Sequence, residues 1–312
     1  MRKRLFAALM CLCLIVSLLP AAALAADEDG VSISIGEYYV PGSKEHPAYA
    51  TTDAATGAIN PILDENFDPD TGTWNIKWDG ETLTLNGATI IYDEYDSAVA
   101  ISSTGNLKIE LMGANTVTGR SCGIDSNGDI TISGSGTLAV SGGDVSESGY
   151  ASHGIYAVGN VTVEGATVTA SGGNGYASYG IYAGGNVTVE GATVTASGGN
   201  GNAIEDYASY GIYADGDVTV EDADADVTAT GGKAGVYSYG IRAYEGIVTI
   251  SGDTVKATGG EAGDDSCGIC ADHGSVNISG GTVETTGGEA GGSSYGIFGT
   301  YKTFLSEGGK TG

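Results

Sequence analysis

The stretch that decides the fold is residues 178–199, which read SYGIYAGGNVTVEGATVTASGG. Three short runs within it alternate between apolar and polar residues, at 178–183, 186–189 and 193–196. Such alternation indicates β-strands, and the glycines between the runs indicate tight turns. The stretch therefore predicts three short strands in succession.

The same unit recurs along the chain, and a Gly-Ile pair marks each copy. Its glycines are separated by 31, 26, 31, 29, 28 and 28 residues, and they are Gly123, Gly154, Gly180, Gly211, Gly240, Gly268 and Gly296. Periods of about 20 to 50 residues are typical of solenoids, whereas a propeller blade needs about 40 residues and four strands. We therefore predict an all-β parallel β-helix (solenoid) of about eight three-strand coils.

Features outside the repeat predict how the chain is divided. Arg2, Lys3 and Arg4 precede an apolar run that ends at a small-x-small site, as in a secretory signal peptide. We expect four segments: a signal peptide at 1–25, an N-terminal cap at 26–75, the β-helix at 76–300 and a tail at 301–312. The tail breaks the repeat and carries no sorting motif, wall-binding repeat or transmembrane helix, so we expect the chain to be released or to be a truncated part of a longer surface protein.

Composition and charge exclude several classes of protein. Glycine supplies 54 of the 312 residues, but proline supplies only 5 and no Gly-X-Y period appears, which argues against collagen. The formal net charge of −27 disfavours nucleic acid and anionic membrane surfaces as partners. We expect a secreted or cell-surface monomer with no membrane insertion after the signal is cleaved.

The repeat also carries a family resemblance. Residues 82–90 read TLTLNGATI, residues 128–134 read GDITISG, and later copies read GIYA followed by VTV. Over about residues 75–298 the chain resembles the carbohydrate-binding-domain and adhesin-like proteins that Gram-positive anaerobes export. The resemblance implies a right-handed parallel β-helix that binds calcium and plant-type polysaccharides without cleaving them.

One column of residues suggests a binding face. The residue after each Gly-Ile pair faces outward by alternation, and this column contains Tyr156, Tyr182 and Tyr213. Stacked aromatic side chains bind sugar rings, so we take these three tyrosines as candidate polysaccharide ligands. Outward stacks of like residues also stabilise neighbouring strands, which leaves a purely structural role open. The residue before each glycine is expected to face inward and to pack.

Calcium is the ion that the acidic residues suggest, because carboxylate and carbonyl oxygens suit a hard cation. Asp125 and Asp129 flank a glycine turn, and three further aspartates alternate in what reads as a strand, namely Asp222, Asp224 and Asp226. Asp129 also belongs to a column with Asn160, Asn186 and Asp217, which suits a hydrogen-bonded ladder at a turn. A solvated acidic face is the alternative for each group.

The cysteines do not suggest a disulfide framework. After signal cleavage three remain, Cys122, Cys267 and Cys270, and an odd number argues against full pairing. Cys267 and Cys270 lie three apart in an expected strand, so they should face opposite ways. Buried free thiols are the expectation, with a strained disulfide or half a metal site as the alternative.

The sequence favours binding over catalysis. Nearly identical coils offer no single differentiated constellation of catalytic groups, so we expect no enzyme activity. The hypothesis is a calcium-stabilised module that binds polysaccharide, such as a host or cell-wall glycan. Two alternatives remain: a structural adhesin or spacer with a protein partner, and a polysaccharide lyase or glycosidase.

Overall fold

The structure, a computed structural model, describes residues 31–64, 66–145, 149–201, 207–252, 254–301, 304–305 and 310–311. The chain divides into two compact units, Met1–Gly30 and Val31–Gly312, and every described residue lies in the second. The expected signal peptide and part of the expected tail lie outside the described residues. Regular structure in the described residues is entirely β-strand, and they contain no helix suited to crossing a membrane.

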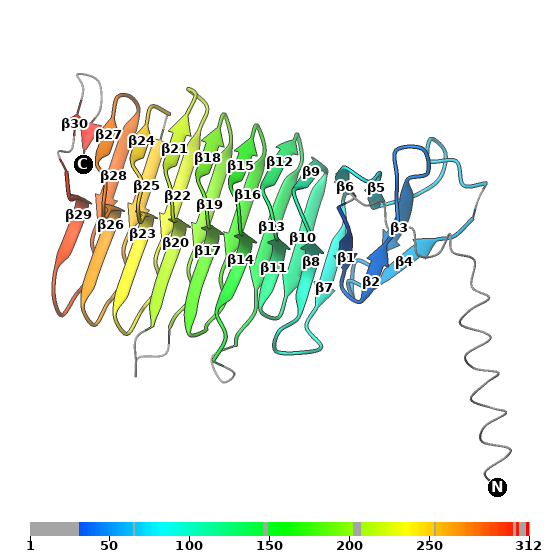
Figure 1. The fold of residues 1–312 in the computed structure, drawn as a ribbon, viewed down its shortest axis with the longest axis horizontal. Coiled ribbons are helices and arrows are strands. Elements are labelled where there is room, and N and C mark those ends of the chain that lie inside the picture. The colour runs from blue at the N-terminus through cyan, green and yellow to red at the C-terminus, as the bar shows by residue number, and fades with distance from the viewer. Residues whose placement is uncertain are drawn as a thin grey trace, which may run out of the picture. The chain divides into compact units, whose positions relative to one another are not determined.

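Three sheets of stacked parallel strands make up the solenoid (Figure 1). The parallel strands of sheet A are β8 (Val99–Ser103), β11 (Cys122–Ser126), β14 (Ser152–Ala157), β17 (Ala177–Ala183), β20 (Ala208–Ala214), β23 (Tyr237–Ala243), β26 (Asp265–Ala271) and β29 (Ser294–Gly299). Those of sheet B are β6 (Thr82–Asn86), β9 (Leu107–Met112), β12 (Ile130–Gly134), β15 (Val161–Glu164), β18 (Val187–Glu190), β21 (Val218–Glu221), β24 (Val248–Ile250), β27 (Val276–Ile278) and β30 (Phe304–Leu305). Sheet C contains β7 (Thr89–Tyr92), β10 (Ala114–Gly119), β13 (Thr137–Gly142), β16 (Thr167–Ser171), β19 (Thr193–Ser197), β22 (Asp226–Thr230), β25 (Thr254–Thr258), β28 (Thr282–Thr286) and β31 (Lys310–Thr311).

Each coil contributes one strand to each sheet, in the order A, B, C. Seven complete coils run from β8 to β28, and β29, β30 and β31 pair onto the seventh. The predicted all-β parallel β-helix is therefore confirmed, with seven complete coils in place of about eight.

Strands of successive coils pair in register, so equivalent residues lie directly above one another. Ile181 pairs with Ile212, and Val187 pairs with Val218. These side chains are fully buried and form a continuous apolar core between the three sheets. Their burial follows from the alternation in the sequence, because every second residue of a strand points inward.

The N-terminal segment covers the first coil with antiparallel strands. These are β1 (Ile33–Ile35), β2 (Tyr38–Val40), β3 (Ala48–Thr52), β4 (Ile59–Ile62) and β5 (Ile76–Trp78). β1 pairs with β8, and β5 pairs with β6. Ile33, Ile35 and Trp78 are buried in the core. The segment thus covers strand edges that would otherwise be open to another chain.

A column of buried serines joins sheet C to sheet A, and sequence reasoning missed it. Its members occupy the second position before each repeat glycine, and they are Ser152, Ser178, Ser209, Ser238 and Ser266. The Ser209 hydroxyl donates to the carbonyl of Gly199 (2.8 Å) and accepts the N–H of Gly232 (2.7 Å) in the next coil. Each such hydroxyl therefore links the coil connections. The sequence signal that could have revealed this column is the serine that recurs two positions before the repeat glycine.

We expect Ser209→Ala to lower the free energy of unfolding by about 1–3 kcal/mol, because the partly buried N–H of Gly232 and carbonyl of Gly199 lose their hydroxyl partner. Ser197→Ala is the matched control, since Ser197 is only half-buried on the outer side of sheet C. We expect the control to change stability by no more than about 0.5 kcal/mol. Urea unfolding monitored by circular dichroism measures both, and equal losses would contradict the proposed role of the column.

Candidate functional site

The outer face of sheet A carries two aromatic columns where the sequence predicted one. In β17, two consecutive residues, Gly180 and Ile181, are buried, so the strict alternation is interrupted. A Cβ at Gly180 would lie 2.7 Å from the carbonyl oxygen of Gly211, which leaves room only for glycine. Tyr179 and Tyr182, on either side of this pair, are only partly buried, and their rings contact each other 5.2 Å apart. The residue before glycine packs, as expected, but it packs against the neighbouring rings outside the core and does not face inward, because the glycine shifts the alternation by one residue.

We call these two sets the pre-glycine column and the post-isoleucine column. The pre-glycine column contains His153, Tyr179, Tyr210, Tyr239, Cys267 and Tyr295. The post-isoleucine column contains Tyr156, Tyr182, Tyr213, Arg242, Cys270 and Phe298. Members of both columns form an apolar cluster separate from the core, namely Tyr179, Tyr210, Tyr213, Tyr239, Cys267, Cys270 and Phe298.

From β14 to β20 the rings within each column stack with nearly parallel planes, and beyond them Tyr239 is tilted by 53° to Tyr210. Tyr156 and Tyr182 lie 5.0 Å apart at 10°, and Tyr182 and Tyr213 lie 5.1 Å apart at 5°. The predicted tyrosine ladder is confirmed as a geometry. Since neighbouring rings cover each other's faces, a ligand reaches mainly ring edges and hydroxyl groups along the ladder. Only an end or a gap of the ladder leaves a ring face free.

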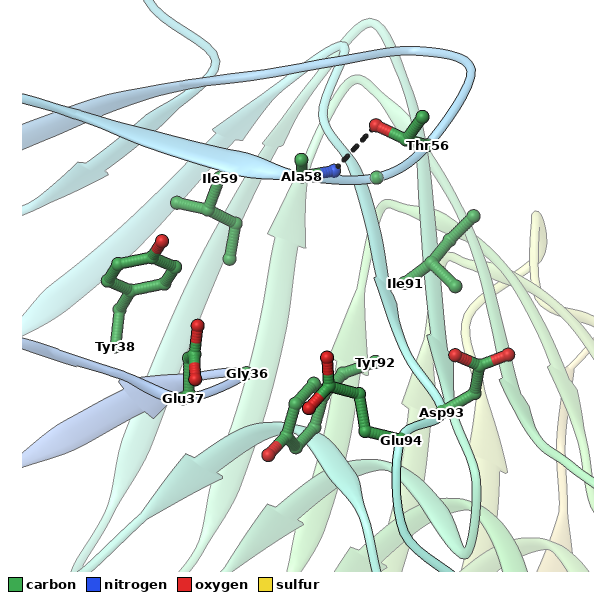
Figure 2. Close-up of a pocket in the computed structure, with 11 residues that line it drawn as sticks. Gly36, Glu37, Tyr38, Thr56, Ala58, Ile59, Ile91, Tyr92, Asp93 and Glu94 are labelled. Atoms are coloured by element: carbon green, nitrogen blue, oxygen red, sulfur yellow. Dashed lines mark hydrogen bonds between the residues drawn. The ribbon is translucent and has the colours of Figure 1, made fainter.

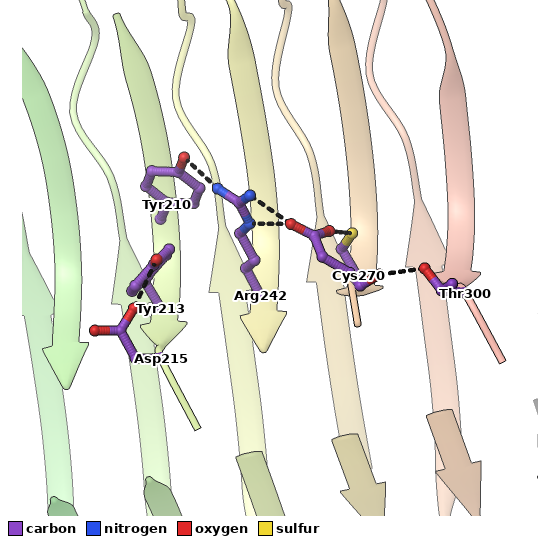
Figure 3. A network of polar contacts seen from close by, with 7 residues as sticks. Tyr210, Tyr213, Asp215, Arg242, Cys270 and Thr300 are labelled. Atoms are coloured by element: carbon purple, nitrogen blue, oxygen red, sulfur yellow. Dashed lines mark hydrogen bonds and ion pairs between the residues drawn. The ribbon is translucent and has the colours of Figure 1, made fainter. Parts of the chain in front are cut away.

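Hydrogen bonds to Asp215 hold the tyrosine ladder in place at Tyr213, the last tyrosine of the post-isoleucine column (Figure 3). The hydroxyls of Tyr213 and Tyr182 both donate to the carboxylate of Asp215, at 2.9 and 3.3 Å. Burial, followed by the charge of Asp215, raises the pKa of Tyr182 to about 12. The hydroxyls of this strip therefore stay protonated at physiological pH.

Arg242 replaces tyrosine in the next coil of the post-isoleucine column. Its Nη1 donates to the Tyr210 hydroxyl (2.8 Å), and its Nε donates to the Asp272 carboxylate (2.9 Å), which Nη2 also contacts. The guanidinium lies 5.2–5.5 Å from four tyrosine rings, including Tyr213. Burial opposes its charge, but attraction to Tyr210 and Asp272 outweighs this, so the pKa of Arg242 lies above its ordinary value. Arg242 thus closes the ladder as a paired cation.

A gap follows in both columns. Cys267 pairs with Tyr239 on one side and Tyr295 on the other, and Cys270 pairs with Arg242 and Phe298. The two small side chains leave a cavity of about 310 Å³, which we call the notch. From the sequence we named only the three tyrosines of the post-isoleucine column and did not predict this gap.

The cysteines of the notch face the same way, which corrects the expectation of opposite faces. Cys267 and Cys270 belong to one apolar cluster because Gly268 shifts the alternation between them. All three described cysteines are buried free thiols, as expected. The Cys270 thiol donates to the Asp272 carboxylate (2.7 Å), and hydrogen bonding with Cys267, followed by burial, raises the pKa of Cys270.

The structure does not bring the five candidate calcium ligands together as one site. Asp125 is half-buried beside Tyr156, and burial raises the pKa of its carboxyl group. Asp129 accepts hydrogen bonds from the N–H (2.8 Å) and side-chain amide (3.0 Å) of Asn160, which confirms the expected ladder at this turn. In the described part of the chain, no group of three or more His, Cys, Asp or Glu residues is placed to hold a metal ion.

The expectation that Asp222, Asp224 and Asp226 alternate in a strand was wrong. Only Asp226 begins a strand, β22, while Asp222 and Asp224 lie in the preceding turn. That turn has two more residues than the Gly191-Ala192 connection of the coil before it. Asp222 adopts a φ of 74°, and in the described residues it is the only non-glycine with positive φ.

A second cavity, of about 270 Å³, lies beside the N-terminal cap (Figure 2). Carboxylates of Glu37, Asp93 and Glu94 line it together with Tyr38 and Tyr92. Burial, followed by the charge of Glu94, raises the pKa of Tyr92. The three carboxylates come from the turn between β1 and β2 and from the loop after β7, so no sequence pattern predicted that they line one cavity.

Comparison with known proteins supports the fold and is silent on the ligand. A family model described as Beta helix repeat matches residues 248–269 and 276–297. The first match spans β24, β25 and part of β26, and the second spans β27, β28 and part of β29. Comparisons with curated proteins and with solved structures each give no match. The chain is thus similar to β-helix repeat proteins over these residues.

The burial of the stacked His153 predicts that the stability of the protein depends on pH. His153 lies 4.9 Å from the Tyr179 ring and also contacts Tyr156 and Tyr182, and burial lowers its pKa to about 4. Between pH 6.5 and pH 4, His153 of the unfolded chain binds a proton, whereas His153 of the folded chain stays neutral. Acidification through this window should therefore cost up to about 3 kcal/mol.

We expect His153→Tyr, which extends the tyrosine column, to remove this part of the pH dependence. Thermal unfolding at pH 7 and at pH 4.5 measures it as a smaller loss of Tm than in the wild type. The control His273→Tyr changes an exposed histidine and should keep the wild-type loss. A His153→Tyr protein with the wild-type loss would contradict the assignment.

The calcium hypothesis is tested at Asp222. We expect Asp222→Gly to raise the free energy of unfolding by about 0.5–1 kcal/mol, because glycine adopts positive φ without strain. The control Asp224→Gly, in the same turn but without positive φ, should give no gain. Unfolding is measured in calcium and in chelator. If Asp222 binds calcium, Asp222→Gly instead loses any stabilisation that calcium gives the wild type.

Proposed function

We propose that this protein is a secreted or cell-surface β-helix module that binds polysaccharide along the outer face of sheet A without cleaving it. The observation that carries the proposal is the pair of adjacent aromatic columns on that face. Rings fill both columns from β14 to β20, and they follow the direction in which the coils stack. An extended polymer fits a linear strip of this kind.

The chemistry of the strip suits hydroxyl-rich ligands. Tyrosine hydroxyls can donate and accept hydrogen bonds, and the Asp215 carboxylate adds a fixed acceptor beside them. Apolar ring edges supply contact area next to these polar groups. The net charge of −27 disfavours highly anionic polymers. We extend the proposal to calcium as a stabilising ion, held by some of the aspartates outside the Asn–Asp ladder.

A structural role is the second candidate, and the stacking favours it. Rings that cover each other's faces at about 5 Å stabilise coil against coil without any ligand. In that case the protein is a spacer or adhesin whose partner is a protein. The two candidates differ in what happens when hydroxyl groups are removed and the rings are kept.

The test is retention on cellulose, xylan, pectin and mucin, with calcium and with chelator, together with an assay for soluble product. We expect retention on at least one polysaccharide and no product. The variant Tyr156→Phe/Tyr182→Phe/Tyr213→Phe keeps the stack and should bind at least fivefold more weakly. Tyr39→Phe, at an exposed tyrosine of the cap, is the matched control and should bind like the wild type.

Three outcomes would contradict parts of this proposal. No retention on any polysaccharide overturns glycan binding in favour of the structural candidate. Equal retention by the triple phenylalanine variant removes the hydroxyl strip from the binding face. Release of soluble oligosaccharide makes the protein a lyase or glycosidase.

A further inference from the structure

The notch lies at β26, the strand between β14 and β29 where neither of the two columns has a ring. On one side stand Tyr239 and Arg242, and on the other stand Tyr295 and Phe298. Between them both positions are cysteines, which are almost fully buried at the bottom of the cavity. Tyr295 is 42% exposed, so part of that wall is open to solvent.

The size of the notch matches one six-membered ring. From β14 to β20 the rings of the columns repeat every 4.9–5.1 Å between centroids, and Tyr239, beside the notch, lies 5.7 Å from Tyr210 and is tilted by 53° to it. Rungs that flank one missing position therefore lie about 10 Å apart. A ring midway between them contacts both walls at ordinary stacking distance. The cavity of about 310 Å³ lies at the lower end of small-molecule sites, which excludes several sugars at once.

The charges around the notch select against an anionic ring. Arg242 is the cation that lines it, and the Asp272 carboxylate already neutralises that guanidinium. A second carboxylate, Asp265, also lines the notch and accepts the N–H of Ser293 (2.8 Å). An added carboxylate would therefore meet repulsion, whereas hydroxyl or amino groups find acceptors.

We propose that the notch binds one non-anionic pyranose ring, inserted as the missing rung between Tyr239 and Tyr295. This inference rests on the proposed function, because the ring belongs to the polysaccharide that the strip carries. It assigns the notch as the subsite where ring faces, and not only ring edges, contact the sugar. The ligand class is a neutral or amino hexose unit, and uronic acids are excluded.

The test fills the notch. Cys267→Tyr places in this coil the residue found at the same position in the coils before and after it, so the fold should accept it. Cys122→Ser changes a buried cysteine outside the notch and is the matched control. Calorimetric titration with cellohexaose, chitohexaose and hexagalacturonate measures the affinity. We expect wild type and Cys122→Ser to bind a neutral oligosaccharide, and Cys267→Tyr to bind it at least tenfold more weakly.

A second variant covers the case in which Cys267→Tyr does not fold. Tyr295→Ala removes the exposed wall of the notch and should also weaken binding about tenfold. If Tyr295→Ala, or a folded Cys267→Tyr, binds like the wild type while the wild type is retained on polysaccharide, the notch is overturned and the proposed function stands. If the wild type binds no glycan at all, both the notch proposal and the proposed function are overturned. Tighter binding of hexagalacturonate than of the neutral oligosaccharides overturns the assigned ligand class.

Discussion

The close approach of successive coils at the repeat glycine is the constraint on which the rest of the structure depends. A Cβ at Gly180, Gly211 or Gly240 would lie 2.6–2.7 Å from a carbonyl oxygen of the next coil. Because only glycine fits there, the strand turns two consecutive residues inward at that point. The same shift directs the residues on both sides outward. One steric requirement thus sets the register of the coils and produces the double aromatic column.

In-register stacking then determines what each substitution does. A tyrosine that follows a tyrosine adds a rung, whereas His153 adds a rung whose protonation costs stability. Arg242 interrupts the tyrosines but is paired with Asp272 and lies against rings on several sides. Cys267 and Cys270 are too short to fill the space that a ring would occupy, and the notch results. Chemical differentiation in a repeat of near-identical coils therefore comes from departures within a column.

The fold was predictable from the sequence to a large extent, and the errors have physical causes. The Gly-Ile period and the alternating runs predicted the coils, and Ile181, Val187 and Val194 are buried as expected. Period-two counting failed beside Gly180 because it assumes an uninterrupted pleat. It failed again at Asp222, where the connection is two residues longer than in the preceding coil. Comparison of connection lengths between coils would have placed Asp222 and Asp224 in a turn.

The site was less predictable, because ring orientation is not encoded by the column itself. Three tyrosines spaced by one coil predict a stack, and the stack exists, but a flat platform and a face-to-face ladder have the same sequence. The 5 Å coil spacing decides between them, since rings at that centroid distance pack as parallel, offset stacks. Once the faces are covered, a ring-binding site requires a small residue at the same position in both columns. The cysteines of one coil meet that requirement, and both shift to one face only because Gly268 lies between them.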